Sequence, residues 1–222
     1  MARGGFQVEA VSVTIFGHLL FIAITSLVLV WLLHFRDGVA FFNSSNSIKI
    51  FNLHPLLMVI GFILVGGEAI MIYKSVPVKR RSVKVVHLLL HLVALVAGIL
   101  GITAVFKSKK EAGLPHMYTL HSWLGMSAIC LFALQYIMGF FSYFFPGAEM
   151  GTRASLLPWH RFLGMAIFLL AVGTAETGLV QYFQFLHLFR SQEALIVNST
   201  ALLLFLYALF VTLSVILPRN YS

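Results

Sequence analysis

Four histidines hold the same relative position in four successive apolar segments of this sequence. They are His54, His87, His121 and His160, and each lies within about the first turn of its segment. An ionisable group at membrane depth is costly, so it usually faces a bundle interior, a polar partner or a cofactor. A single such histidine is best interpreted as an interfacial residue at a helix end. Four histidines in phase with four helices favour a set of ligands instead.

Six long apolar segments make up most of the 222 residues, of which 60% are hydrophobic and only 10% charged. A helix needs about 20 apolar residues to cross a hydrocarbon core of about 30 Å. The segments are continuously apolar rather than alternating, which favours helices over a lipid-facing barrel. The predicted spans are Val11–His34, His54–Tyr73, Val85–Phe106, Tyr118–Phe145, Trp159–Phe183 and Ala194–Leu217. We therefore expect an all-α integral membrane protein built as one domain, residues 1–222.

The order of the spans assigns a depth to each of the four histidines. Short connections make consecutive helices antiparallel neighbours, so His54 and His121 share one depth while His87 and His160 share the opposite depth. Facing imidazoles suit the two axial positions of a haem iron and leave no open position for oxygen, which favours electron transfer. We expect a four-helix core, formed by the second to fifth spans, that holds two haems.

Other polar residues inside the spans have more than one interpretation. His91 lies one turn after His87 on the same face. A role in supporting a ligand histidine or a haem propionate and a role as an ordinary core histidine fit this position equally well. Glu68 and Glu176 are most simply neutral, hydrogen-bonded carboxyls, although proton coupling through them is conceivable. The remaining histidines in and near the spans are interpreted as structural or loop residues: His18, His34 and His187.

Two rival functions use the same residue types. A membrane di-iron hydroxylase or desaturase needs several histidines clustered on one membrane face, whereas His87 and His91 form the only such cluster and the other histidines alternate sides. A metal or solute carrier would use the intramembrane glutamates and histidines without a haem. A visible spectrum separates these alternatives from a protein with paired-histidine haems.

The net charge of +8 lies in short segments at the ends of the spans, where membrane proteins keep cations, and does not indicate nucleic-acid binding. Six spans put both termini on one side, which holds nine cations against six on the other. This bias favours cytosolic N- and C-termini, although the Lys107–Lys110 cluster argues against it. The nine cations are Arg3, Lys74, Lys79, Arg80, Arg81, Lys84, Arg153, Arg161 and Arg219.

Two motifs around the histidines are specific when they occur together. Asn52-Leu53-His54-Pro55 and Tyr118-Thr119-Leu120-His121-Ser122-Trp123-Leu124-Gly125 resemble the cytochrome b561 family, especially its ascorbate-dependent transmembrane ferrireductases. Gly67-Glu68-Ala69, Tyr73-Lys74-Ser75 and Pro158-Trp159-His160 extend the resemblance over nearly the whole chain. The resemblance implies a homodimer with two non-covalent b haems, whose axial ligands fall on His54/His121 and His87/His160. It also implies cytosolic ascorbate as donor, and monodehydroascorbate or a ferric chelate as acceptor on the far side.

The resemblance further assigns roles to residues near the two surfaces. Ascorbate binding falls on Arg80, Lys84 and Arg153, with Arg80 standing where a relative often has lysine. Lys74 matches a position that binds a propionate of the cytosolic haem, while His116 and Tyr118 match contacts of the other haem. Lys109 is expected to attract the anionic acceptor, although some relatives have a histidine near it. Gln181 stands where many relatives carry a glutamate and is a further expected haem contact.

Overall fold

The computed structural model describes residues 10–41, 46–76 and 79–218. Six helical crossings are present in these residues, as predicted, and the described residues contain no strand. Arg3 and Arg219, which entered the charge argument, lie outside them. The crossings are α1 (Ala10–Val30) with η1 (Trp31–Phe35), α2 (Ser47–Leu56) with η2 (Leu57–Leu64) and α3 (Val65–Ser75), α4 (Arg80–Glu111), α5 (Leu120–Tyr143), α6 (Met150–Phe185) and α7 (Gln192–Ile216).

The second crossing is one helix interrupted by a wider segment. Pro55 has no N–H to donate to the preceding turn, and its ring crowds that turn. The chain continues beyond it as the π-helical segment η2 and returns to α-helical geometry at Val65. The irregular segment therefore begins at Leu57, three residues after His54, one of the four aligned histidines.

Helices α4 and α6 are longer than the apolar segments that predicted them. Helix α4 starts at Arg80 instead of Val85 and α6 starts at Met150 instead of Trp159, so the expected breaks there are too long. Long cationic side chains reach water while the backbone remains helical, which apolar content alone does not reveal. Arg80, Lys84 and Arg153 consequently sit on rigid helical turns and not on loops.

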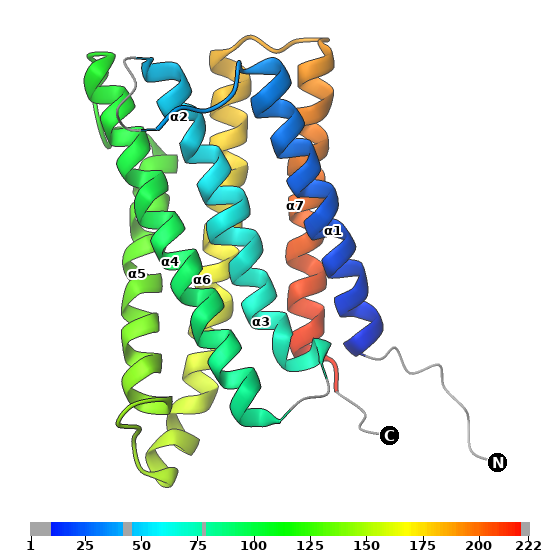
Figure 1. Ribbon diagram of the computed structural model, residues 1–222, viewed down its shortest axis with the longest axis vertical. Helices are drawn as coiled ribbons and strands as arrows, with labels where there is room; N and C mark the ends of the chain where they lie inside the picture. The colour runs from blue at the N-terminus through cyan, green and yellow to red at the C-terminus, as the bar shows by residue number, and fades with distance from the viewer. Residues whose placement is uncertain (1–9, 42–45, 77–78, 219–222) are drawn as a thin grey trace, which may run out of the picture.

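The helices form an elongated bundle with a core and a flank (Figure 1). The crossing α2–η2–α3 packs on α4, α5 packs on α6 and α4, and α6 also contacts η2. Helices α1 and α7 pack on each other and cover α3 and α6 from one side. Helix α1 begins and α7 ends at the same end of the bundle (Figure 1). The predicted four-helix core therefore has the flanking pair α1 and α7 on one side.

Candidate functional site

The four aligned histidines lie in two facing pairs, one towards each end of the bundle. His54 from α2 faces His121 from α5, with ring centroids 6.0 Å apart and ring planes at 89°. His87 from α4 faces His160 from α6, with centroids 6.4 Å apart and planes at 66°. The structure thus brings together the residues that the antiparallel order of the helices placed at a common depth.

Three of these imidazoles have the same hydrogen-bonded orientation. The Nδ1 atoms of His54, His87 and His121 lie 3.0, 2.7 and 2.9 Å from the main-chain oxygens of Gly101, Ala69 and Thr174. A carbonyl oxygen only accepts, so each Nδ1 carries the proton and each Nε2 keeps its lone pair. Histidines that bind metals are fixed in this way, because the bond sets both the tautomer and the ring orientation.

The spacing of the rings fits a single metal ion between each pair. Metal–imidazole bonds of about 2 Å on both sides, with half the width of each ring added, put the ring centroids about 6 Å apart. The observed centroid distances of 6.0 and 6.4 Å match this spacing. Both pairs therefore have the ring spacing that two imidazoles holding one metal ion would need, and the three hydrogen-bonded rings keep the Nε2 lone pair that would bind it.

Two glycines keep room for the imidazoles between α5 and α6. A Cβ atom on Gly178 would lie 2.6 Å from Cε1 of His121, and one on Gly139 would lie 3.2 Å from Cε1 of His160. Each histidine from one helix thus packs on the bare backbone of the other. The sequence analysis missed both glycines, because this signal depends on the register between α5 and α6. The same register of α5 against α6 produces both glycine–histidine contacts.

His160 differs from the other three because its Nδ1 faces a side chain. The Gln135 amide nitrogen lies 2.9 Å from this Nδ1 and donates to the His160 main-chain oxygen at 2.8 Å. Half a turn of the amide would let its oxygen accept from Nδ1–H as the carbonyls do elsewhere, but it would give up the bond to the His160 main-chain oxygen. The side chain of Gln135 therefore positions this imidazole. This role was not predicted from the sequence.

Replacing Gln135 by leucine is expected to weaken haem binding at the His87/His160 pair about 10- to 100-fold, the usual cost of losing a partner of a metal-bound histidine. Haem titration of the purified protein measures the change, with the His54/His121 centre as internal reference. Gln135→Glu keeps an oxygen acceptor for Nδ1–H and should bind more tightly than the leucine variant. Equal affinity of wild type and Gln135→Leu would contradict this role.

A polar cluster at the His54 end of the bundle joins α1, η1, α6 and α7. Glu193 accepts a hydrogen bond from Trp31 Nε1 at 2.8 Å and pairs with the Arg36 guanidinium, which also lies over the Tyr182 ring at 5.9 Å. Burial lowers the pKa of Arg36, but the bond and charge of Glu193 outweigh it, so the net pKa is raised. The cluster therefore holds Arg36 charged and fixed in place.

The same cluster fixes the connection that leads into His54. Asn52 is fully buried, and its amide donates to the main-chain oxygens of Arg36 at 2.9 Å and Gly38 at 2.6 Å. Asn52 precedes His54 by two residues, so the Arg36–Gly38 segment is tied to the helix that carries the imidazole. The asparagine of the Asn-Leu-His-Pro motif therefore has a structural role.

Two of the cations expected to bind ascorbate converge near His160. Lys84 Nζ donates to the Tyr143 main-chain oxygen at 3.2 Å, and Arg153 Nε donates to the main-chain oxygen of Ala148. Tyr143 is the last residue of α5 and Ala148 lies in the connection to α6, and the Tyr143 ring lies 5.1 Å from the His160 ring. An anion in this region would meet two cations from two rigid helices beside the histidine pair.

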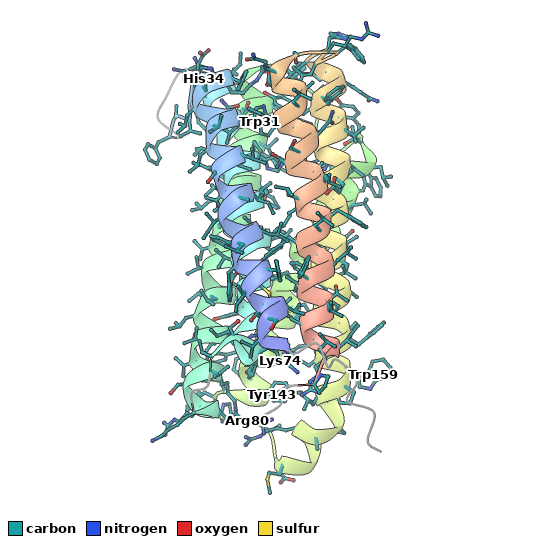
Figure 2. All side chains as sticks on the ribbon, turned by 90° about the vertical axis from the view of Figure 1, so that its right-hand side faces the viewer. Trp31, His34, Lys74, Arg80, Tyr143 and Trp159 are labelled. Atoms are coloured by element: carbon teal, nitrogen blue, oxygen red, sulfur yellow. The ribbon has the colours of Figure 1, made fainter. Side chains whose placement is uncertain are left out.

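Arg80 and Lys74 lie at the same end of the bundle (Figure 2). Arg80 opens α4 and is exposed, one turn before Lys84. Lys74 Nζ donates to the main-chain oxygen of Leu217 at 2.6 Å, where α3 meets the end of α7. Its expected role towards a propionate remains a prediction.

The residues expected near the opposite surface form a small group between α4 and α5. Lys109 Nζ lies 5.2 Å from the centre of the Tyr118 ring, and this ring is largely exposed. His116 stacks on Phe106 of α4 with centroids 4.9 Å apart. Gln181 is exposed on α6, one turn beyond Gly178. The structure joins Lys109 with Tyr118, while Gln181 lies on another helix, α6, and its expected haem contact remains a prediction.

His91 lies in the middle of the bundle. Its ring is 4.4 Å from that of His87 and 5.4 Å from that of Phe132, and its buried Nδ1 has no hydrogen-bond partner among the described residues. It lines a cavity of about 20 Å³ together with Phe62, Phe132 and Gly164. The other residues that line this cavity are apolar or glycine, so His91 is its one polar side chain among the described residues.

A six-helix membrane bundle with two imidazole pairs at two depths has the architecture of a transmembrane electron carrier. Residues 53–186 match the model of the eukaryotic cytochrome b561 family. This match covers more than half of the chain, and the chain belongs to that family. The family resemblance inferred from the motifs is thereby confirmed, and membership implies a b-type haem. The chain is a membrane oxidoreductase.

Named relatives align over most of this chain. A probable ascorbate-specific transmembrane electron transporter from Oryza sativa is 43% identical over 97% of this chain and 94% of its own length. A transmembrane ascorbate ferrireductase from Arabidopsis thaliana is 42% identical over 94% of this chain and 88% of its own. A transmembrane ascorbate-dependent reductase from Ovis aries is 39% identical over 74% of this chain and 64% of its own.

The di-iron alternative lacks its ligand set. Within residues 10–41, 46–76 and 79–218 no three His, Cys, Asp or Glu side chains converge on a possible metal site. The paired imidazoles remain the arrangement that the family's cofactor would use.

Proposed function

We propose that this protein carries single electrons from cytosolic ascorbate, through two b haems, to monodehydroascorbate or a ferric chelate on the opposite side of the membrane. The single observation that supports this most is the presence of two facing imidazole pairs at two depths of one bundle. The haems would supply the reversible one-electron chemistry. The relatives' names, which specify ascorbate and ferrireductase, support the choice of donor and acceptor.

The chain contributes positioning at each step of this proposal. Lys84 and Arg153, with Arg80 one turn away, would attract the ascorbate anion to the end that carries His87 and His160. Lys109 beside Tyr118 would attract an anionic acceptor at the other end. The carbonyls of Gly101, Ala69 and Thr174 hold three imidazoles with Nε2 free for the metal. This assignment puts the start of α1 and the end of α7 in the cytosol, and we extend it to a homodimer as the family resemblance implies.

A vesicle experiment tests the proposal directly. Purified protein in liposomes that enclose a ferric chelate is expected to reduce the chelate when ascorbate is added outside, because the two haem positions divide the membrane into short electron hops. Enclosed ferrous iron and the haem spectrum are measured together. Liposomes with the His121→Ala variant, which lacks one member of a pair, should reduce the chelate no faster than protein-free liposomes. Equal rates with wild type and protein-free liposomes would overturn the proposal.

A further inference from the structure

Three ionisable or polar side chains meet inside the membrane region, away from the paired histidines. His18 Nδ1 of α1 lies 2.7 Å from Glu68 Oε2 of α3. Tyr207 of α7 donates its hydroxyl to the Leu64 main-chain oxygen at 2.8 Å, and this hydroxyl lies 3.5 Å from Glu68 Oε1. We call His18, Glu68 and Tyr207 the membrane triad. It is formed by the flanking helices α1 and α7 and the helix α3 that they cover.

The packing of the helices builds this site. Gly17 and Gly67, each next to a member of the triad, are points of close approach. A Cβ atom on Gly17 would lie 2.7 Å from Sδ of Met71, and one on Gly67 would lie 2.6 Å from Cε1 of Tyr207. Small residues at such positions let helix backbones come close together in a membrane. The carboxyl of Glu68 consequently lies between α1 and α7, with about a fifth of its side chain still exposed.

The membrane triad lies at the depth of the cytosolic histidine pair. His18 follows the start of α1 by eight residues, Glu68 precedes the end of α3 by seven, and Tyr207 precedes the end of α7 by nine (10 to 18, 68 to 75, 207 to 216). His87 follows the start of α4 by seven residues at the same end of the bundle (80 to 87). With a rise of about 1.5 Å per residue, all four lie about 10 to 14 Å inside their helix ends.

A direct connection joins the triad to that pair. The residue after Glu68 is Ala69, whose main-chain oxygen lies 2.7 Å from His87 Nδ1. The carboxyl of Glu68 is therefore one residue away from the group that orients His87. Charges that sit close together in a poorly polarisable region influence each other strongly. An electron added beside His87 makes a proton on the triad more favourable, and the converse holds to the same extent.

We propose that the membrane triad takes up one proton when the His87/His160 centre is reduced, an inference that rests on the proposed function. The electron comes from the donor, and the proton comes from cytosolic water. The proton binds to the Glu68–His18 pair and forms one new O–H or N–H bond, so the region gains no net charge. On reoxidation the electron passes to the second centre and the proton leaves the pair.

Few other titratable groups face the carboxyl of Glu68. Among the described residues, α1 contributes His18 and α7 contributes Tyr207, while α4 contributes His87 behind the Ala69 carbonyl. The segment η2 contains only apolar residues and glycine. Glu68 with His18 is therefore the pair that would take up the proton, while the Tyr207 hydroxyl, which donates to the Leu64 main-chain oxygen, lies beside the carboxyl at 3.5 Å.

The test follows the reduction potentials of both haems of the full-length protein as a function of pH. If a proton accompanies the electron, a lower pH favours the reduced form, so the potential of the cytosolic centre falls as the pH rises. Glu68→Gln keeps the shape and hydrogen bonds of the side chain but removes its titration. In this variant the reduction potential of the cytosolic centre should no longer fall as the pH rises. The His54/His121 centre should keep its wild-type behaviour in the variant.

Glu176→Gln is the matched control, because Glu176 is also an intramembrane carboxyl but lies on α6, and its buried Oε1 has no hydrogen-bond partner among the described residues. It should retain the pH dependence of the cytosolic centre. His18→Gln, at a half-exposed side chain, tests the same pair if Glu68→Gln does not fold, and it should also lose the dependence. A fall that persists in Glu68→Gln or in His18→Gln, or that disappears in Glu176→Gln, overturns the inference. Wild-type protein that binds no haem would instead overturn the proposed function.

Discussion

Replacing His121 by alanine is expected to remove one haem and leave the other in place, so that haem content falls to about half of the wild-type value. His121 and His54 form one pair, and a b haem is held only by its ligands and its surroundings. The reduced-minus-oxidised spectrum and the haem-to-protein ratio of purified protein measure the loss. His54→Ala should remove the same centre as His121→Ala, because the two imidazoles face each other at 6.0 Å.

Variants of the other histidine pair complete the test of the pairing. His87→Ala and His160→Ala should remove the other centre, and combining one alanine from each pair should remove both. His187→Ala is the matched control, since His187 lies in the connection between α6 and α7 and should leave both haems bound. The pairing is wrong if His121→Ala retains two haems, or if His54→Ala and His121→Ala remove different centres.

The architecture of the bundle was predictable because lipid imposes a simple rule on the sequence. Each crossing needs a minimum length of apolar helix, and all six predicted spans correspond to helices of the structure. The depth of the histidines followed from the same rule, because short connections force alternate directions. The ends of α4 and α6 did not follow, since the turns around Arg80 and Arg153 are polar and carry no apolar signal.

The side-chain environment of the histidines was not predictable to the same degree. Gly139 and Gly178 matter only because α5 and α6 pack in one register. Gln135 faces His160 across that same contact. The pairing of Arg36 with Glu193, two residues far apart in the chain, likewise depends on how η1 meets α7. A sequence read one helix at a time does not specify these contacts.

The membrane triad shows how such contacts change the interpretation of single residues. Glu68 and His18 were each explained from the sequence as an isolated group, a neutral carboxyl and a structural histidine. The structure places them 2.7 Å apart on helices that are distant in the chain. Two groups that indicate no function alone form the proposed proton site where they meet at the depth of His87.

Removing two cations at the cytosolic end is expected to impair the use of ascorbate far more than haem binding. The double variant Lys84→Met and Arg153→Met should lower kcat/KM for ascorbate roughly 100- to 10,000-fold, because each hydrogen bond to a charged group contributes about 1.5 to 3 kcal/mol and about 1.4 kcal/mol corresponds to tenfold. Methionine keeps much of the apolar length of both side chains. Stopped-flow reduction of the haems at several ascorbate concentrations measures the effect, and dithionite measures reduction without the ascorbate site.

The control for this prediction also removes a cation from this end of the bundle, but at a position away from the expected site. Arg81 lies on the same first turn of α4 as Arg80 and is exposed, and no role at the site is assigned to it. Arg81→Met should change kcat/KM for ascorbate by less than about threefold at physiological salt, where exposed charges are screened within about 8 Å. If Arg81→Met lowers kcat/KM as much as Lys84→Met does, the cations act as a general positive surface. In that case the convergence of Lys84 and Arg153 on the α5–α6 connection does not define a binding site.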